Sequence, residues 1–227
     1  MARELLGKIV EEGAEAIITI GYLGNKKVII KQRISKPYRD PEFDHIFRLT
    51  RTKTEAKILA DLYTRGLNVP APLIVDLKNY VIIMEYIEGK KLSDIIASLG
   101  DSLGYIAEKI GKMIGTMHTL AIYHGDLTLA NILITNNQDV YIIDFGLAGY
   151  SRDVEEYAID LHLLRRNIQA LAPDYYDIFF KYFITGYRTG YRGDVNSVLE
   201  RFEEIRLRGR YVEERLKKRI EGEKYIE

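Results

Sequence analysis

The stretch YHGDLTLANILITNNQDVYIIDFGLAGY, residues 123–150, sets an aspartate, an asparagine and a second aspartate around short apolar segments; these are Asp126, Asn131 and Asp144. The segments NILIT and VYIID, separated by the polar turn NNQD, predict a β-hairpin. Because the two ends of an antiparallel hairpin lie side by side, we expect Asn131 and Asp144 to be neighbours, with Asp126 close to both. A plain hairpin would account for the turns but not for three polar groups placed at them.

The composition is that of a folded protein with no bias in charge. Of the 227 residues, 47% are hydrophobic and 29% are charged, which is enough for a core and too apolar for a disordered chain. The 33 basic residues balance 33 acidic ones, so net charge gives no argument for a general nucleic-acid or membrane binder. The absence of cysteine excludes disulfides, thiolate zinc sites and a cysteine nucleophile. We find no signal-peptide core and no membrane-spanning run, and expect a soluble cytoplasmic protein.

The N-terminal part predicts a small sheet with one helix. Residues 17–23 and 28–30 are apolar and β-branched and are joined by the turn GNKK, and KIVEEGAEA before them ends one strand and begins a loop. Apolar residues recur at helical spacing over 43–65, and Gly66 is a reasonable stop. The segments VPAPLIVD and YVIIMEYIEG predict two further strands.

The rest of the chain is mainly helical. Residues 92–99 and 103–120 predict a short and a longer helix, HGDLTLA is a loop before the hairpin, and the helical pattern resumes near Glu155. We therefore expect an α+β protein that is one domain of two lobes. The N-terminal lobe would cover residues 1–88 and the C-terminal lobe residues 89–227.

The order of the polar residues suggests a chemistry. Phosphoryl transfer needs a carboxylate that orients the attacking group, oxygen ligands for magnesium, and a lysine on the phosphates that is itself held by a glutamate. This chain has a candidate for each in the order that protein kinases use: Gly13 in EEGAEA, Lys31 in VIIK, Glu55 in RTKTEAKIL, Asp126 and Asn131 in HGDLTLAN, and Asp144 in IIDFG.

Each of these signals is weak by itself. Gly13 between strands is usually a turn, Lys31 alone a solvated strand lysine, Glu55 alone a solvated helix face, and a lone DFG a chance match. His124 is more often a structural histidine bonded to the backbone than a catalytic base. The catalytic-loop string, the hairpin and DFG in this order are strong together, and with Lys31 and Glu55 they indicate a bilobal protein-kinase-like fold.

Several features depart from ordinary protein kinases. The glycine loop has one glycine instead of three, and Thr128 stands where protein kinases carry a lysine. No APE motif follows DFG, and the helical pattern resumes near Glu155, so we expect no extended activation segment. A kinase of this kind lacks the usual platform for a peptide substrate.

With these departures the chain resembles the small atypical kinase of the KEOPS complex, the PRPK-like family. The resemblance runs from about Glu11 to Arg210, and the stretches that carry it are EEGAEA, KQRISKPYRDPEFD, RTKTEAKIL, HGDLTLANILI, IDFGLAGYSRDVEEYAIDLHLLRRNI and RLRGR. The GAEA loop and YRDPEFD are more specific to this family than the catalytic loop. The family commonly ends soon after an RGRK-like tail, whereas here RGR is followed by YVEERLKKRIEG.

The resemblance implies ATP and Mg²⁺, or Mn²⁺, as cofactors, and Ser/Thr phosphorylation that includes autophosphorylation. It also implies an ATPase role in the complex that makes threonylcarbamoyl-adenosine on tRNA. The partners that it implies are the carbamoyltransferase-like synthase subunit and a small adaptor on the N-terminal lobe, with no membrane.

The resemblance also assigns roles to single residues. Asp126 would be the catalytic aspartate, Asn131 and Asp144 the metal ligands, and Lys31 the contact to the α/β-phosphates, held by Glu55. The other implied ATP-binding residues are Gly13, Ala14, Glu15 and Ala16 over the phosphates, Met84 behind the adenine, and the backbone of Glu85 and Ile87 on the base. Asp160 would support the catalytic loop, although a solvated helix charge is an equal interpretation of this residue.

Four alternatives stay open on the sequence. They are a RIO-type kinase, a small-molecule kinase of the aminoglycoside or choline type, a catalytically weak scaffold, and a tRNA-binding module. The last rests on residues 201–219, where eight basic and four acidic residues leave a net charge of +4. Such a run is usually a solvated helix face, but it can also contact phosphates of tRNA.

Overall fold

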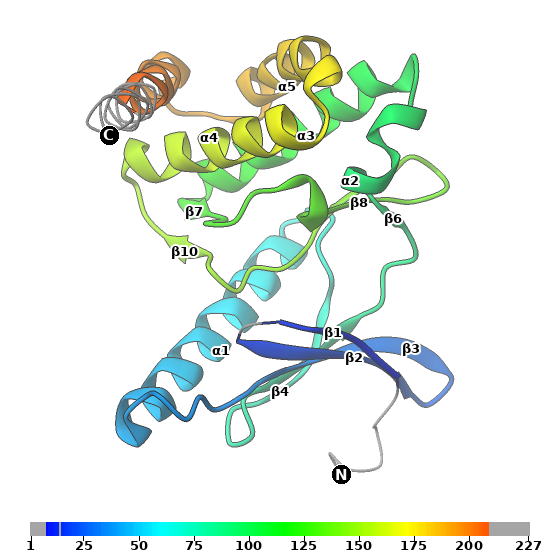
Figure 1. Ribbon diagram of the computed structural model, residues 1–227, viewed down its shortest axis with the longest axis vertical. Coiled ribbons are helices and arrows are strands. Elements are labelled where there is room, and N and C mark those ends of the chain that lie inside the picture. The colour runs from blue at the N-terminus through cyan, green and yellow to red at the C-terminus, as the bar shows by residue number, and fades with distance from the viewer. Residues whose placement is uncertain (1–7, 14, 209–227) are drawn as a thin grey trace, which may run out of the picture.

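The structure is a computed structural model that describes residues 8–13 and 15–208. It has two lobes (Figure 1). The lower lobe consists of a twisted sheet and one long helix, and the upper lobe is mainly helical. The sheet is antiparallel with the strand order β1-β2-β3-β5-β4. Its strands are β1 Lys8–Glu12, β2 Ala16–Leu23, β3 Lys26–Arg33, β4 Pro72–Asp76 and β5 Val81–Glu85.

The central strand β3 explains how the sheet holds a charged residue in place. Val28 and Ile30 pack with residues of β5 on one face, while Ile29 packs on the main core of the molecule. This alternation follows from the period of two along a strand. Lys31 lies opposite Ile18 of β2 and Ile82 of β5, so its backbone is paired on both sides.

Helix α1, Pro41–Thr64, begins two residues before the predicted start. Pro41 belongs to the first turn, where a missing N–H costs nothing, and the Asp40 side chain accepts hydrogen bonds from the next free amides, Glu42 N and Phe43 N. The face of α1 that includes Glu55 and Leu59 is buried. Pro41 thus begins the helix.

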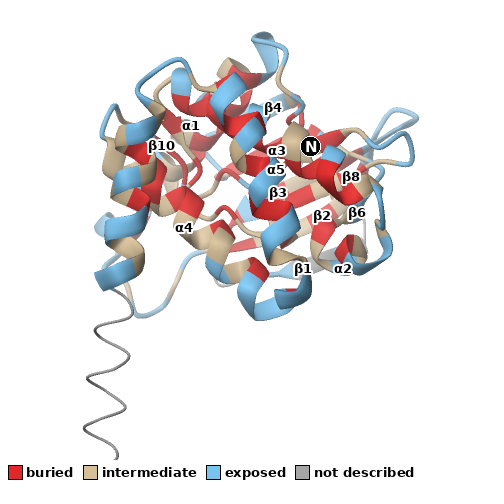
Figure 2. Cartoon of the chain, turned by 90° about the horizontal axis from the view of Figure 1, so that it is seen from above, coloured by how far each residue is buried: buried red, intermediate tan, exposed pale blue. Residues whose placement is uncertain are grey.

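The helical lobe is built on α3 Ser102–Thr119, α4 Val154–Leu171 and α5 Tyr176–Gly190. Helices α3 and α5 approach closely, because a Cβ at Gly111 would overlap Phe183 O and one at Gly186 would overlap Glu108 O. Buried positions gather between the helices, and the outward faces are exposed (Figure 2). Residues 195–208 form a further helix beside the start of α4.

Short elements complete this lobe, and several of them were not predicted. The predicted helix 92–99 is α2 Leu92–Ile95 followed by the 3₁₀ turn Ile96–Ser98, and the helical pattern after residue 155 is interrupted by the 3₁₀ turn Pro173–Tyr175. The strands are β6 Lys90–Lys91, β7 Ile122–Tyr123, β8 Ile132–Ile134, β9 Val140–Ile142 and β10 Gly149–Tyr150, and a 3₁₀ turn covers Leu129–Asn131. Within the described ranges, no helix has the length and apolarity needed to cross a membrane.

Candidate active site

A buried ion-pair cluster joins β3 to α1. Glu55 accepts hydrogen bonds from Lys31 Nζ at 2.7 Å and from Arg33 Nη2 at 2.6 Å, and these side chains are at most 8% exposed. Burial by itself lowers the pKa of Lys31, but the carboxylates of Glu55 and Asp144 outweigh burial and raise it above the ordinary value. Lys31 is therefore a fixed positive charge, and the structure brings it together with Glu55.

Helix α4 holds the predicted catalytic loop in place through Asp160. Asp160 is fully buried and accepts hydrogen bonds from His124 N at 2.6 Å and Gly125 N at 2.8 Å. Its carboxylate also contacts His118 Nε2 at 3.2 Å. Gly125 has φ of 77°, and a Cβ there would lie 2.5 Å from Leu147 O, so only glycine fits. Asp160 is therefore a support of the loop and not a solvated helix charge.

His124 links the loop to the hairpin that follows it. Its Nδ1 accepts a hydrogen bond from Asp126 N at 3.2 Å, so the ring proton sits on Nε2, which donates to Ile143 O at 3.1 Å. The ring is fully buried and packs on Phe145. His124 is thus the structural histidine that the sequence suggested.

The hairpin brings its two polar ends together as predicted. Strand β8 pairs with β9, and Ile143 N donates to Asn131 O at 2.9 Å just beyond the ladder. The Asn131 Nδ2 group donates to Asp126 O at 2.9 Å and to Asp126 Oδ2 at 3.0 Å. Because the side-chain nitrogen of Asn131 donates to Asp126, the side-chain oxygen of Asn131 remains available as a metal ligand.

Asp144 completes the polar cluster. Its Oδ1 accepts from Lys31 Nζ at 2.6 Å and from Gly146 N at 3.1 Å, and its side chain is 40% exposed. Burial tends to raise the pKa of Asp144, but the Lys31 ammonium prevails and lowers it below the usual range. Its φ of 61° lies in the left-handed region, where a side chain is strained. Asp144 is therefore an ionised, conformationally fixed carboxylate.

These residues line two adjoining clefts between the lobes. The first, of about 480 Å³, has an apolar wall that includes Ile18, Ile20 and Ile29 and a polar floor, and its lining includes the candidates Lys31, Glu55, Met84, Glu85, Ile87, Asp126, Asn131 and Asp144. The second, of about 410 Å³, shares Lys31, Asp126 and Asp144 and adds Gly13, Glu15 and Ala16. Ala14 lies outside the described residues. Because Glu85 N donates to Ala71 O at 2.9 Å, a base could meet only the backbone carbonyl of Glu85.

The donor set fits Mg²⁺ with a nucleotide. Among the described residues no three His, Cys, Asp or Glu side chains gather into a metal site. The Asp144 carboxylate and the Asn131 amide oxygen offer two oxygen ligands, and Mg²⁺ typically takes its remaining ligands from phosphates and water. Lys31 and Arg33 would supply positive charge to phosphates bound in these clefts.

Two groups of this site were missed by sequence reasoning. Arg33 follows Lys31 by two residues on the same face of β3, a spacing that the strand period could have revealed. Gly146 lines the second cleft and belongs to the DFG string. The site therefore holds one more cation than the motif order suggests.

The segment after Asp144 is short. Strand β10 pairs with β7 at Tyr123 and Ile122, and α4 begins at Val154. The Tyr150 hydroxyl donates to Asp61 Oδ2 of α1 at 2.6 Å, and burial and Asp61 raise the pKa of this phenol. The predicted absence of an extended activation segment is confirmed, and the segment is tied to the helix that carries Glu55.

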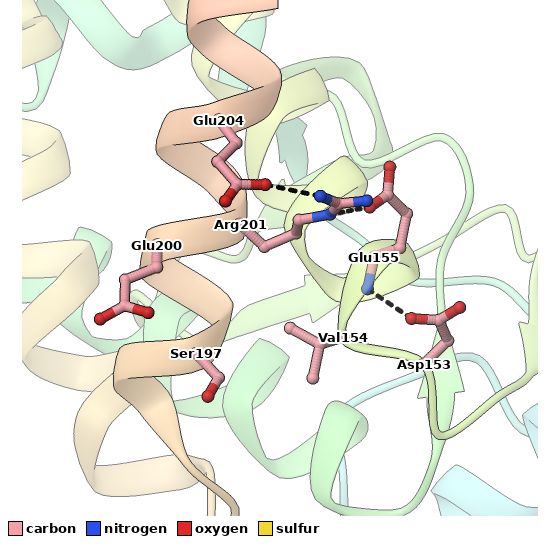
Figure 3. Close-up of a pocket in the computed structure, with 7 residues that line it drawn as sticks. All are labelled: Asp153, Val154, Glu155, Ser197, Glu200, Arg201 and Glu204. Carbon is pink, nitrogen blue, oxygen red and sulfur yellow. Dashed lines mark hydrogen bonds and ion pairs between the residues drawn. The ribbon is translucent and has the colours of Figure 1, made fainter.

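A further cleft of about 410 Å³ lies away from these groups, between the start of α4 and helical residues 195–208. Figure 3 shows Arg201 directed at Glu155 of α4 and Glu204 of its own helix. Arg206 pairs with Glu203 at 2.6 Å, and Arg208 lies 3.7 Å from Glu204. The basic run 201–219 is thus partly neutralised where the structure describes it, and Arg210, Arg215, Lys217, Lys218 and Arg219 lie outside the described residues.

The comparisons with known sequences give two likenesses. A family model described as RIO domain matches residues 25–183. The KEOPS complex subunit Bud32 of Pyrococcus abyssi is 38% identical over 215 residues, which cover 91% of this chain and 97% of the relative. A protein of Methanosphaera stadtmanae named "Probable bifunctional tRNA threonylcarbamoyladenosine biosynthesis protein" is 40% identical over 204 residues, and this chain spans only 37% of its length.

Solved structures agree with the fold. The Rio2 kinase of Chaetomium thermophilum has a TM-score of 0.56 and 18% identity, with 89% of this chain and 69% of that chain covered. A second structure of this kinase, described as an ADP/Mg²⁺-phosphoaspartate complex, has a TM-score of 0.54 and 17% identity, with 89% and 67% covered. The prediction of a bilobal kinase-like α+β fold is confirmed.

Proposed function

Because this chain belongs to the RIO-domain family and to the family of the KEOPS subunit Bud32, we propose that it binds ATP with Mg²⁺ between its lobes and transfers the γ-phosphoryl group. The acceptor is a Ser or Thr hydroxyl, including one of its own, or water. The RIO-type kinase and the KEOPS kinase are not alternatives here, since both likenesses hold for the same chain.

The observation that carries this proposal is the cluster of Lys31, Glu55 and Asp144, which joins parts from both lobes. Lys31 Nζ lies 2.7 Å from Glu55 and 2.6 Å from Asp144, so the phosphate-binding lysine and the metal ligand are already adjacent. A lysine held in this way neutralises the α/β-phosphates of the nucleotide. Positioning and charge compensation provide most of the catalysis in phosphoryl transfer.

The nucleotide follows the two clefts. Met84 lies behind the adenine, and the carbonyl of Glu85 and the amide of Ile87 pair with the base. Gly13, Glu15 and Ala16 cover the phosphates. The Glu15 carboxylate accepts a hydrogen bond from Arg39 Nη2 at 3.0 Å. The arginine therefore partly offsets the negative charge that Glu15 brings close to the phosphates.

The reacting groups come from the hairpin and the loop before it. Asp126 accepts the proton of the attacking hydroxyl or water, the attacking oxygen bonds to the γ-phosphorus, and ADP leaves with the β-phosphate oxygen. Asn131 and Asp144 would hold Mg²⁺, which would compensate the negative charge on the phosphates. The Asn131 amide holds Asp126 at 3.0 Å, which fixes the carboxylate for this role.

The short segment between Asp144 and α4 favours water, or a residue presented by the protein itself, over a free peptide. We therefore propose that ATP hydrolysis within a KEOPS-type complex is the main activity and that it supports the tRNA threonylcarbamoyladenosine modification named for the relatives. The proposed partners are the carbamoyltransferase-like synthase, a small adaptor on the N-terminal lobe, and tRNA through the C-terminal basic stretch.

The test is ATP turnover by the purified chain, alone and with the synthase subunit, with phosphoprotein and free phosphate counted separately. We expect slow self-labelling by the chain alone and release of free phosphate that rises with the partner. A chain that neither binds nor consumes Mg-ATP in either condition would leave a scaffold as the remaining role.

A further inference from the structure

Arg33 is a buried cation, and at least one of its N–H donors has no hydrogen-bond acceptor among the described residues. The side chain is 3% exposed, and its Nη2 donates a hydrogen bond to Glu55 Oε2 at 2.6 Å. Its Nη1 is buried and has no hydrogen-bond partner among the described residues. A guanidinium has five N–H donors, and a buried donor without an acceptor is costly, so a missing acceptor is expected near this group.

The Arg33 side chain lines the second cleft next to Gly146. A Cβ added there would be 3.1 Å from Asp144 Oδ1, 3.2 Å from Lys31 Nζ and 3.5 Å from Arg33 Nη2. A side chain at this position would therefore stand among three charged atoms. Glycine avoids this crowding at the edge of the second cleft, which Arg33 and Gly146 both line.

The position of the second cleft relative to the adenine base identifies the ligand group that would bind there. The residues assigned to the adenine, Met84, Glu85 and Ile87, line the first cleft but not the second. Lys31, Asp126 and Asp144 line both clefts, so they mark the middle of the nucleotide. The second cleft, with Arg33, is accordingly at the end farthest from the base.

We propose that Arg33 binds the terminal phosphate of ATP and lets the site distinguish ATP from ADP. This inference rests on the proposed ATP binding. Glu55 keeps hold of Nη2 as a pivot, and the guanidinium turns its remaining N–H groups to the γ-phosphate oxygens. Arginine suits this task because its fork can serve a carboxylate and a phosphate at once, whereas a lysine ammonium has no such geometry.

The test compares the affinities for Mg-ADP and for a non-hydrolysable Mg-ATP analogue, measured by calorimetric titration. Arg33→Met should lower the affinity for the ATP analogue about ten- to a hundredfold while affecting ADP much less. Arg33→Lys keeps a charge but loses the planar fork of donors, so its loss should be intermediate. Arg48→Met is the matched control, because it removes an α1 arginine that pairs with Asp44 at 2.7 Å outside both clefts.

Each outcome has one meaning. An equal loss for ADP and the ATP analogue in the Arg33 variants would show that Arg33 only holds Glu55, and would overturn the inference while leaving the proposed function intact. Wild-type protein that binds neither nucleotide would overturn both. Thermal unfolding checks that each variant is folded. If Arg33→Met does not fold, the comparison of the two nucleotide affinities is made with Arg33→Lys.

Discussion

Replacement of Asp160 by alanine should destabilise the protein from the centre of its helical lobe. The wild-type carboxylate is fully buried and accepts hydrogen bonds from the amides of His124 and Gly125. In the alanine variant both amides lose their acceptor, and each buried unsatisfied donor costs about 1–3 kcal/mol. The expected loss in the free energy of unfolding is therefore about 2–6 kcal/mol, a large part of the roughly 5–15 kcal/mol of a typical protein.

The assay is urea unfolding at neutral pH, in a buffer without nucleotide, followed by circular dichroism. Asp160→Asn should lose about half as much, because its amide oxygen can still accept one of the two N–H groups while its NH₂ cannot accept the other. Glu200→Ala is the control for removing an exposed helical carboxylate and should change the unfolding free energy by less than about 0.5 kcal/mol. An Asp160→Ala loss below about 1 kcal/mol would refute the assignment of Asp160 as the support of the catalytic loop.

Three further predictions concern the charged groups. Lys31→Ala and Glu55→Ala should be strongly non-additive in kcat/KM, because they break one buried pair; multiplicative losses in the double variant would show independent roles. Asp144→Asn should weaken nucleotide binding in the presence of Mg²⁺ and change it little in EDTA, as seen in thermal-shift titrations; equal shifts in both would exclude a metal role. Burial, only partly opposed by Asp160, lowers the pKa of His118 in the folded protein. The unfolded chain therefore binds more protons below the ordinary pKa of 6.5, and stability should fall as the pH drops through that value, by at most about 1.4 kcal/mol per pH unit. His118→Gln should flatten this slope, and an unchanged slope would contradict the argument.

The parts of the site that the sequence predicted are those defined by local pattern. The β8–β9 hairpin follows from alternation around a polar turn, and it alone brings Asn131 next to Asp144. The order of Lys31 and Glu55 along the chain matched a known arrangement, and the structure pairs them at 2.7 Å. Local periodicity and motif order were sufficient for these residues.

The parts that were missed depend on contacts between distant segments. Strands β7 and β10 have two residues each and exist because they pair with each other, so no periodicity could reveal them. The role of Asp160 was undecided on the sequence, since only the packing of α4 against the loop buries it. Arg33 carried no motif, and its importance comes from Glu55 beside it and from the second cleft, which it lines together with Gly146.

The structure describes only the first part of the basic C-terminal run, up to residue 208. Arg201, Arg206 and Arg208 each lie next to a glutamate, either within the same helix or on α4. Pairs at i,i+3 and i,i+4 reduce the field that a phosphate backbone would meet. A tRNA contact through this stretch remains a proposal, and it would depend mainly on the basic residues beyond 208.

The measurement that tests the central claim most directly compares ATP binding and ATP turnover in Asp126→Asn. The substitution keeps the size of the side chain and an oxygen for the Asn131 amide, so nucleotide binding and the thermal midpoint should stay close to wild type. Turnover should fall at least about a hundredfold, because the group that accepts the proton of the nucleophile is gone. The control is Asp139, which lies in the same hairpin and is paired loosely with Lys109 at 3.9 Å. The Asp139→Asn variant should turn over ATP at the wild-type rate. Near-normal turnover by Asp126→Asn would contradict the account.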